Sequence, residues 1–137
     1  MAKGNEAYVD TSALIAFLDR SDFHHELFKR LFSNPPSLVT TVLVVAEGHA
    51  WFLRRYDRTR AMQFLKLLEV LPSLSIQSVG RTEQSSAAIL LRKFSDQDLT
   101  LVDAVGLHLI QQKRLASCWS TDFHLGLTGV PLVINQF

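Results

Sequence analysis

The sequence contains a single cysteine, and this excludes two kinds of site. Cys118 has no second cysteine with which to form an internal disulfide or a cysteine-based metal centre. It stands in the stretch LASCWSTD, where a small apolar residue in a buried strand is the favoured interpretation. The six glycines form no loop that could cradle a phosphate. Neither Ser12 nor Ser120 has the flanking glycines of a hydrolase nucleophile.

Long apolar runs and an excess of either charge are also missing. No stretch approaches the roughly 18 apolar residues of a membrane span, and the start MAKGNEAYVD has no apolar core like that of a signal peptide. The net charge is +1, so no field of the whole protein indicates nucleic acid. With 137 residues, of which 47% are hydrophobic and 20% charged, the composition predicts one globular domain over residues 1–137, in the cytoplasm.

Strand and helix patterns alternate along the chain without an internal repeat or a linker. Apolar or alternating stretches predict strands at 6–10, 37–40, 73–79, 116–120 and 131–135. Helical periodicity predicts helices at 12–19, 22–32, 41–56, 60–71, 82–94 and 100–115. This alternation predicts the α/β class, with a mainly parallel sheet covered by helices. In such folds the working site lies outside the carboxyl ends of the strands.

Two aspartates follow predicted strands directly. Asp10 comes after AYV, and Asp122 comes after CWST. Both could have a purely local role, because Asp10 could cap the helix that starts near Ser12 and Asp122 could begin a turn. Their shared position at strand ends nevertheless fits a site at the edge of the sheet.

Two further carboxylates lie on apolar helix faces. Glu47 has Leu43, Val44, Ala50 and Trp51 as its neighbours three and four residues away. Asp103 shares its side of a helix with Gly106, Leu107 and Ile110. A buried charge must be paired, protonated or bound to a metal. Arg54 is the structural alternative for Glu47, and a capping box with Thr100 is the alternative for Asp103.

A hard cation would explain all four acids together, because oxygen-rich sites without Cys or His suit Mg²⁺ or Mn²⁺. The histidines show no metal-site spacing. We expect partly exposed helix or loop residues at His24, His25, His49, His108 and His124.

Arginines surround one tyrosine in the stretch RRYDRTR. Arg54, Arg55 and Arg58 could contact RNA phosphates while Tyr56 stacks on a base. Cations are also favoured at the C-terminal end of a helix. A solvated helix end is therefore the alternative, and the stretch taken alone favours it.

The stretches YVDTSALIAFLDR, TTVLVVAEGHAW, FSDQDLTLVDAVGLHLIQQKRL and STD followed by GV resemble the PIN-domain family. The likeness is greatest to the small single-domain VapC-type ribonuclease toxins. It covers nearly the whole chain in the right order and spacing, and DTSAL and SDQDLTLVDA are its most specific parts. The resemblance implies a three-layer α/β/α sandwich with a central sheet of four to five strands. It further implies an endoribonuclease that uses Mg²⁺ or Mn²⁺, an antitoxin partner and a homodimer. Because the sequence has no membrane-spanning run, we expect no membrane partner.

Carried over residue by residue, the resemblance assigns the catalytic and metal-binding acids to Asp10, Glu47, Asp103 and Asp122. Residues that would support these acids are Thr11, Ser12, Ser120 and, in the subgroup with a DxDLT stretch, Asp98. One departure is Phe123, which follows the last acid directly, where relatives usually have the aromatic residue a little later.

Two other interpretations stay open at this stage: a phosphoaspartate protein, either an enzyme or a receiver-like domain, and a module without catalytic activity. A phosphoaspartate enzyme could also use Asp10, although Ser12 stands where the haloacid-dehalogenase type has its second aspartate. A receiver-like domain would need a lysine on a late strand, and the predicted late strands have none. A catalytically silent RNA-binding or interaction module would keep the same acids without using them. Incubation with RNA and Mn²⁺, Mg²⁺ or EDTA separates this last interpretation from the nuclease.

Overall fold

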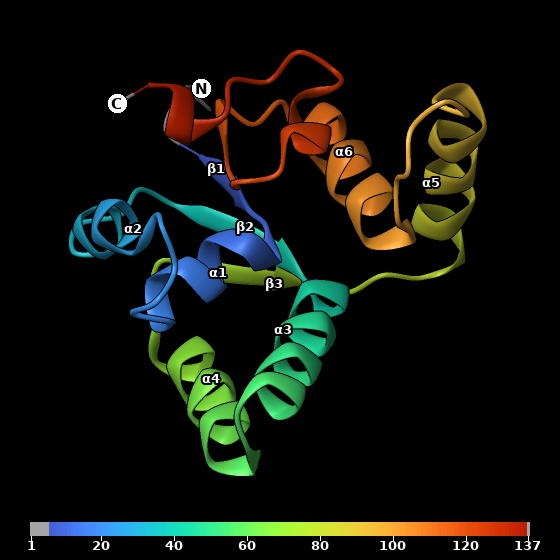
Figure 1. Cartoon of the computed structure of the whole chain (residues 1–137). Coiled ribbons are helices and arrows are strands. Elements are labelled where there is room, and N and C mark those ends of the chain that lie inside the picture. Colours follow the sequence, from blue (N-terminus) through green and yellow to red (C-terminus); the bar gives the residue numbers. More distant parts are fainter. Residues whose placement is uncertain (1–5, 137) are drawn as a thin grey trace.

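Residues 6–136, the part of the chain that this computed structural model describes, form four strands and six α-helices around one sheet (Figure 1). In chain order the elements are β1 (Ala7–Val9), α1 (Thr11–Leu18), α2 (His25–Leu31), β2 (Leu38–Thr41), α3 (Val42–Arg55), α4 (Arg58–Val70), β3 (Leu74–Gln77), α5 (Arg81–Lys93), α6 (Leu101–Lys113) and β4 (Ser117–Trp119). Two 3-10 helices follow, at Phe123–Gly126 and Val133–Asn135. No helix in this described range is long and apolar enough to cross a membrane.

The sheet has the strand order β3-β2-β1-β4, and every neighbouring pair is parallel. The first strand is therefore central, with Tyr8 opposite Val39 of β2 and Cys118 of β4. All residues of β1 and β2 are buried, as expected for strands covered on both faces. Since β1 and β4 are parallel neighbours, the residues that follow them emerge side by side at one edge of the sheet.

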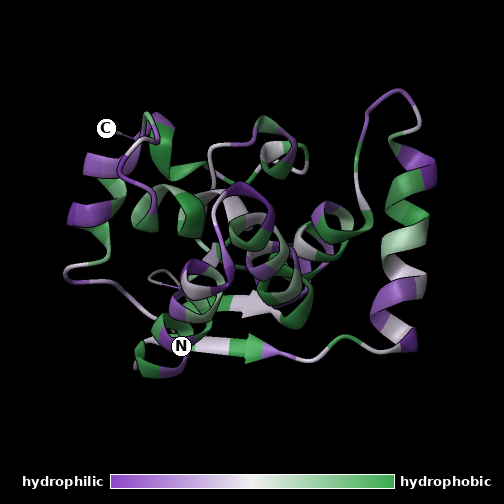
Figure 2. Ribbon diagram, turned by 60° about the horizontal axis from the view of Figure 1, so that its bottom comes forward, coloured by the Kyte–Doolittle hydropathy of each residue, from purple (hydrophilic) through white to green (hydrophobic). Residues whose placement is uncertain are grey.

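Helices cover both faces of the sheet, which confirms the predicted α/β/α sandwich. In Figure 1, α1 to α4 lie on one side of the strands, and α6 with the C-terminal segment lies on the other. α5 packs along α6 and stands at the edge of the molecule. Figure 2 shows hydrophobic stretches where the helices face the strands and one another, and hydrophilic stretches at loops and helix ends.

Close packing of α6 on the central strand depends on Gly106. A Cβ at this position would lie 2.9 Å from both the Cε2 and the hydroxyl oxygen of Tyr8, which is fully buried in β1. The absence of a side chain lets the two backbones approach. Asp103 lies one turn before Gly106 on the same helix, so this contact also brings its carboxylate toward the end of β1.

The predicted caps of two helices are confirmed. The Thr41 hydroxyl accepts a hydrogen bond from the Val44 N–H at 3.3 Å, and this begins α3. At the start of α6, the Thr100 hydroxyl accepts from the Asp103 N–H at 3.1 Å. The Thr100 N–H donates to Asp103 Oδ2 at 3.3 Å.

Two sequence predictions were wrong in extent or type. The helix expected at 22–32 begins only at His25, because the Asp22 carboxylate accepts from the His24 N–H at 2.8 Å and forms a turn instead. Phe23, expected on the apolar face of that helix, is 93% exposed. The strand expected at 131–135 is a single parallel bridge from Cys118 to Leu132 followed by a 3-10 helix. The sheet accordingly has four strands.

Candidate active site

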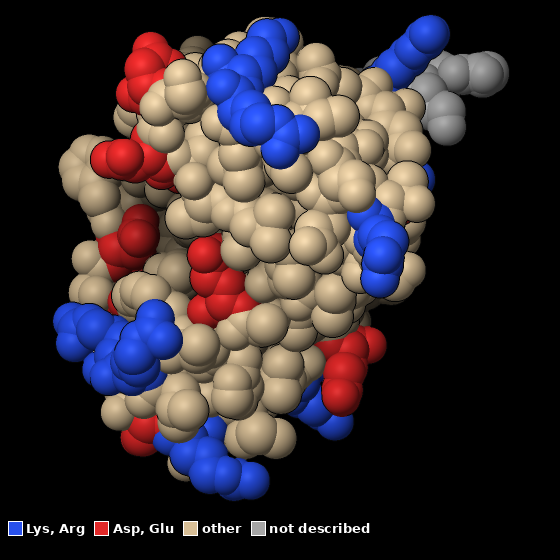
Figure 3. All heavy atoms as spheres, turned by 90° about the vertical axis from the view of Figure 1, so that its right-hand side faces the viewer, with Lys and Arg blue, Asp and Glu red and all other residues tan. Residues whose placement is uncertain are grey.

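The four acids singled out in the sequence line one pocket of about 310 Å³. Each comes from a different element. Asp10 follows β1 and caps α1, and Glu47 lies on α3. Asp103 is in the first turn of α6, and Asp122 follows β4. Figure 3 shows acidic side chains in a hollow on this face of the molecule, with a group of basic side chains beside it. The fold thus brings carboxylates from both halves of the chain together.

Two serines tie the ends of β1 and β4 to each other through Asp10. Its Oδ2 accepts from the Ser12 hydroxyl at 2.8 Å and from the Ser120 hydroxyl at 3.0 Å. The Thr121 N–H donates to the Ser12 oxygen at 3.0 Å, and the Asp122 N–H donates to the Ser120 oxygen at 2.9 Å. These bonds fix the orientation of the Asp10 carboxylate and the course of the chain into Asp122.

The other three carboxylates are also held by one oxygen each. Glu47 Oε1 accepts a short hydrogen bond from the Thr11 hydroxyl. Asp103 Oδ2 accepts from the Thr100 N–H, and Asp122 Oδ1 accepts from the His124 N–H at 3.0 Å. Among residues 6–136, no group donates a hydrogen bond to the second oxygen of any of the four acids. Each carboxylate is therefore oriented and still has an oxygen free for a ligand.

No lysine or arginine in the described residues lies within ion-pair distance of a carboxylate. Arg54 lines the same pocket as Glu47 but forms no ion pair with it, so the pairing considered from the sequence is not made. No lysine or arginine in this part of the chain thus offsets the mutual repulsion of the four acids. This arrangement suits a bound cation.

Burial and mutual repulsion raise the pKa of two of these acids. Burial raises the pKa of Asp10 to about 6, and the charges of Asp103 and Glu47 add to this against the hydrogen bonds from Ser12 and Ser120. Burial and the charge of Asp122 also raise the pKa of Asp103, and its hydrogen bonds with Thr100 oppose this. Holding both acids ionised together at neutral pH is costly unless positive charge enters the pocket.

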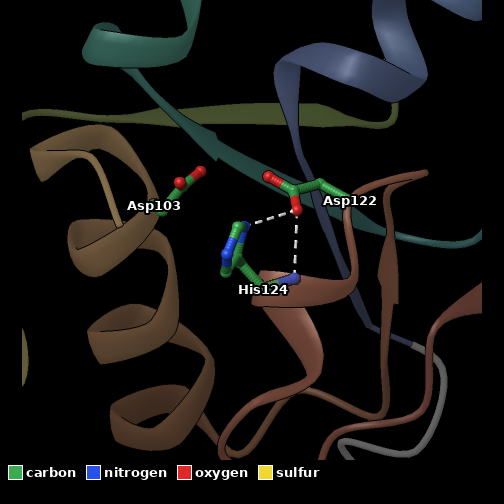
Figure 4. Close-up of side chains that lie close together, drawn as sticks. All are labelled: Asp103, Asp122 and His124. Carbon is green, nitrogen blue, oxygen red and sulfur yellow. Dashed lines mark hydrogen bonds and ion pairs between the residues drawn. The ribbon is translucent and has the colours of Figure 1, made fainter. Parts of the chain in front are cut away.

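His124 belongs to this site, although the sequence pattern indicated only a partly exposed loop residue. Its Nδ1 lies 2.8 Å from Asp122 Oδ1. One ligand atom each of Asp103, Asp122 and His124 lies within 4.8 Å of the others. Figure 4 shows the three side chains turned toward one another, from α6 and from the segment after β4. The available signal was its place two residues after Asp122, inside the turn that this acid starts.

The remaining sequence candidates divide into those at the pocket and those away from it. Thr11, Ser12 and Ser120 contact the acids as described, and Arg54 lines the pocket. Asp98 is exposed and does not line it. Arg55 lies over the Tyr56 ring at 5.0 Å, and Arg58 is an exposed residue at the start of α4. Only one of the three candidate RNA-binding arginines therefore reaches the acidic pocket.

Comparison with known proteins identifies a family and several structures that share this fold. A family model for the PIN domain matches residues 7–124. The structure of VapC20 from Mycobacterium tuberculosis, described as a toxin that cleaves the sarcin-ricin loop, aligns with a TM-score of 0.82 at 22% identity, over 90% of this chain and 95% of that one. No protein with a curated description matches the chain in sequence.

Two further structures align over most of their length. A toxin-antitoxin complex from Klebsiella pneumoniae gives a TM-score of 0.61 at 19% identity, over 91% of this chain and 92% of that one. PAE2754 from Pyrobaculum aerophilum gives a TM-score of 0.61 at 21% identity, over 96% of this chain and 92% of that one. At these identities the likeness establishes the shared fold.

Proposed function

The chain belongs to the PIN-domain family, and on this premise we propose that it is a metal-dependent endoribonuclease, the toxin of a toxin-antitoxin pair. One observation carries the proposal. Carboxylates from β1, α3, α6 and the end of β4 meet in one pocket, each with a free oxygen and none paired with lysine or arginine in the described residues. Such a set of donors fits Mg²⁺ or Mn²⁺.

In this proposal Asp10, Asp103 and Asp122 hold the cation through their free oxygens. Glu47, fixed by the Thr11 hydroxyl, either joins them or orients the attacking water. A divalent cation supplies a water that is nucleophilic at neutral pH and stabilises the charge that develops on the scissile phosphate. Ser12 and Ser120 keep the Asp10 carboxylate in place. Arg54, at the same pocket, is positioned to contact the RNA phosphate.

The imidazole of His124 bears on which cation the pocket takes. A nitrogen beside Asp103 and Asp122 favours Mn²⁺ over Mg²⁺, because Mg²⁺ prefers oxygen donors and imidazole suits transition metals better. The sequence predicts a site with oxygen donors only, and we now add a nitrogen of His124 to the proposed ligands.

Partners are proposed from the descriptions of the similar structures. VapC20 is described as an RNA-loop-cleaving toxin, and the Klebsiella structure is a toxin-antitoxin complex. We propose RNA as the substrate and an antitoxin protein as the inhibitor, with the homodimer expected from the family resemblance. Action on cellular RNA corresponds to a cytoplasmic location.

The test is RNA cleavage by the purified protein in Mn²⁺, in Mg²⁺ and in EDTA. We expect cleavage with either metal and none in EDTA. Asp103→Asn should lower the rate by more than the roughly 10- to 100-fold typical of losing a group that only orients a ligand. Asp96→Asn is the matched control, since Asp96 is exposed in the segment before α6 and lies outside the pocket. Cleavage by Asp103→Asn at the wild-type rate contradicts the proposal, and RNA binding without cleavage in every metal favours the catalytically silent module.

A further inference from the structure

A second pocket of about 480 Å³ lies where the end of α1 meets the end of α3 and the start of α4. Its wall includes Asp19, Arg20, Tyr56, Arg60 and Gln63. We propose that this pocket binds one unpaired nucleotide of the RNA substrate, with the base against Tyr56 and Asp19 and a phosphate against Arg20 and Arg60. The inference rests on the proposed function, because it extends the substrate beyond the bond that is cut.

Asp19 offers an acceptor for the edge of a base. The residue as a whole is 5% exposed. Oδ1 accepts from the Ser21 N–H at 3.0 Å, from the Ser21 hydroxyl at 2.8 Å and from the Tyr56 hydroxyl at 2.8 Å. No group in the described part of the chain donates to Oδ2. Because Asp19 lines the pocket, this oxygen can accept a hydrogen bond from a ligand there, and the amino or imino N–H of a nucleobase is such a donor.

This carboxylate stays ionised at neutral pH. Burial raises its pKa, but the hydrogen bonds from Ser21 and Tyr56 and the charge of Arg55 outweigh that effect and hold the pKa below its usual value. The group facing the pocket is therefore an acceptor only. It selects an N–H donor and repels an anionic group, so the phosphate belongs at the cationic side chains of the pocket wall.

Arg20 and Arg60 provide that cationic side. Both are exposed at the pocket, and neither forms an ion pair with a carboxylate of residues 6–136. The Arg60 guanidinium lies 4.7 Å from the centre of the Tyr56 ring, and that of Arg55 lies at 5.0 Å. Guanidinium groups on an aromatic ring combine charge for phosphate with a flat surface for stacking, as in sites for single-stranded nucleic acid.

The second pocket adjoins the acidic one along α1 and α3. On α1, Ile15 lines the acidic pocket and Leu18, one turn later, lines the second. Across α3, the Trp51 ring of the acidic pocket lies 6.2 Å from the Tyr56 ring of the second. From Glu47 to Tyr56 the helix advances about 13 Å. One RNA strand can thus present a phosphate to the acids and a nearby base to Tyr56.

The geometry favours a particular class of RNA. A base can enter the pocket only if it is unstacked and unpaired, so a loop, bulge or single strand is the expected substrate. The acidic side chains of a partner protein could form ion pairs with Arg20 and Arg60, but the free oxygen of Asp19 would repel them. We therefore favour RNA over a protein as the occupant.

The test measures binding in EDTA, where metal-dependent cleavage is absent. A labelled single-stranded ribonucleotide hexamer is titrated with wild type, with the double variant Arg20→Ala/Arg60→Ala and with Arg81→Ala/Arg92→Ala. The last is the matched control, since it removes the same charge from exposed positions of α5, away from both pockets. We expect the first double variant to weaken binding about tenfold or more. The slope of log K against log salt should fall by about 1.4, or 0.7 for each lost phosphate contact.

Abasic substitution at each position of the hexamer tests the base contact. Loss of the base at one position should weaken RNA binding by wild type about tenfold, as expected for a lost stacking contact. Tyr56→Leu should bind the intact and the abasic hexamer equally, because the stacking surface is gone. Asp19→Asn, which replaces the proposed acceptor for the base by an amide, gives a second test of the base contact if Tyr56→Leu does not fold. The inference is overturned if both double variants weaken RNA binding equally, or if no abasic position lowers the affinity of wild type. It is also overturned if the abasic penalty persists in the single variants that remove the base contact. Absence of RNA binding by wild type also overturns it, and direct binding of a labelled acidic peptide to wild type but not to Arg20→Ala/Arg60→Ala would then assign the pocket to a protein partner. Cleavage assays with Asp103→Asn judge the nuclease proposal separately.

Discussion

Asp10 shows how one side chain serves both the fold and the site. Its Oδ2 takes the hydrogen bonds of Ser12 and Ser120, which join the ends of β1 and β4, while its other oxygen has no donor among the described residues. The carboxylate is 5% exposed and has no cationic partner. In the absence of a cation, the surroundings of this carboxylate disfavour its ionisation. Its placement is suited to binding metal and unfavourable for the metal-free fold.

The metal-free protein should therefore lose stability as the pH rises. The pKa of Asp10 is about 6 in the folded chain and 3.8 without the influence of the fold. Its stabilising contribution is complete below the unfolded value and is lost as the pH rises through about 6, a change of about 3 kcal/mol. Asp103, whose pKa is also raised, acts in the same direction. Urea unfolding in EDTA should give a lower free energy of unfolding at pH 7.5 than at pH 5.

Asp10→Asn separates this effect from the other ionisable groups. The amide cannot ionise, so the variant should be more stable than wild type at pH 7.5 and should lose less stability between pH 5 and pH 7.5. Asp96→Asn, at an exposed position, should keep the wild-type pH dependence. A wild-type protein that is equally stable at both pH values would show that the Asp10 carboxylate is not destabilised by its surroundings.

At the scale of the element, the start of α6 sets the position of Asp103. Thr100 caps the helix through its hydroxyl, and its N–H contacts the Asp103 carboxylate. Of these two contacts, Thr100→Ala removes the one made by the hydroxyl, and it also removes the methyl group. We expect it to cost about 1 kcal/mol of stability, the usual effect of losing an N-cap. Because the backbone N–H still donates to Asp103, RNA cleavage should fall far less than in Asp103→Asn.

Thr100→Ser is the control for the cap, since it keeps the hydroxyl and removes only the methyl group. Thermal unfolding should place it near wild type. If serine and alanine destabilise the protein equally, packing of the methyl group, and not the cap, stabilises this end of α6.

Local signals predicted most elements, and they failed where tertiary contacts decide the structure. Thr41 and Thr100 mark their helices because the capping bonds are made within the same few residues. The apolar run at 131–135 is no strand, although Leu132 and Val133 are buried, because a single bridge from Leu132 to Cys118 is followed at once by a 3-10 helix. The early start assigned to α2 counted Phe23 as part of an apolar face, whereas the turns formed by Asp19 and Asp22 leave it in solvent.

On the scale of the whole molecule, the candidate site forms only when distant segments meet. The apolar helix faces around Glu47 and Asp103 and the strand ends before Asp10 and Asp122 were sufficient to name the acids that the fold brings together. His124 could not be selected in the same way, because its role depends on the turn that directs it toward Asp103. Nor could the second pocket be predicted, since Asp19 and Tyr56 meet only through the packing of α1 on α3.

Since the unfolded chain cannot gather these acids, a metal that binds them should stabilise the whole fold. At a concentration of Mn²⁺ 100 times its dissociation constant, the gain is about 2.7 kcal/mol. For a domain of this size, the melting temperature should rise by on the order of 10 °C. Thermal unfolding with Mn²⁺ should show this rise in wild type and in Asp96→Asn, and little of it in Asp103→Asn.

The same measurement tests the role of His124. With the imidazole present, Mn²⁺ should stabilise the protein more than Mg²⁺ at equal concentration, and His124→Ala should reduce this difference, because only oxygen donors remain. An unchanged difference would mean that His124 only orients Asp122 through the 2.8 Å contact. If Mn²⁺ stabilises Asp103→Asn as much as wild type, the cation binds elsewhere, and the convergence of the four acids has another purpose than holding a metal.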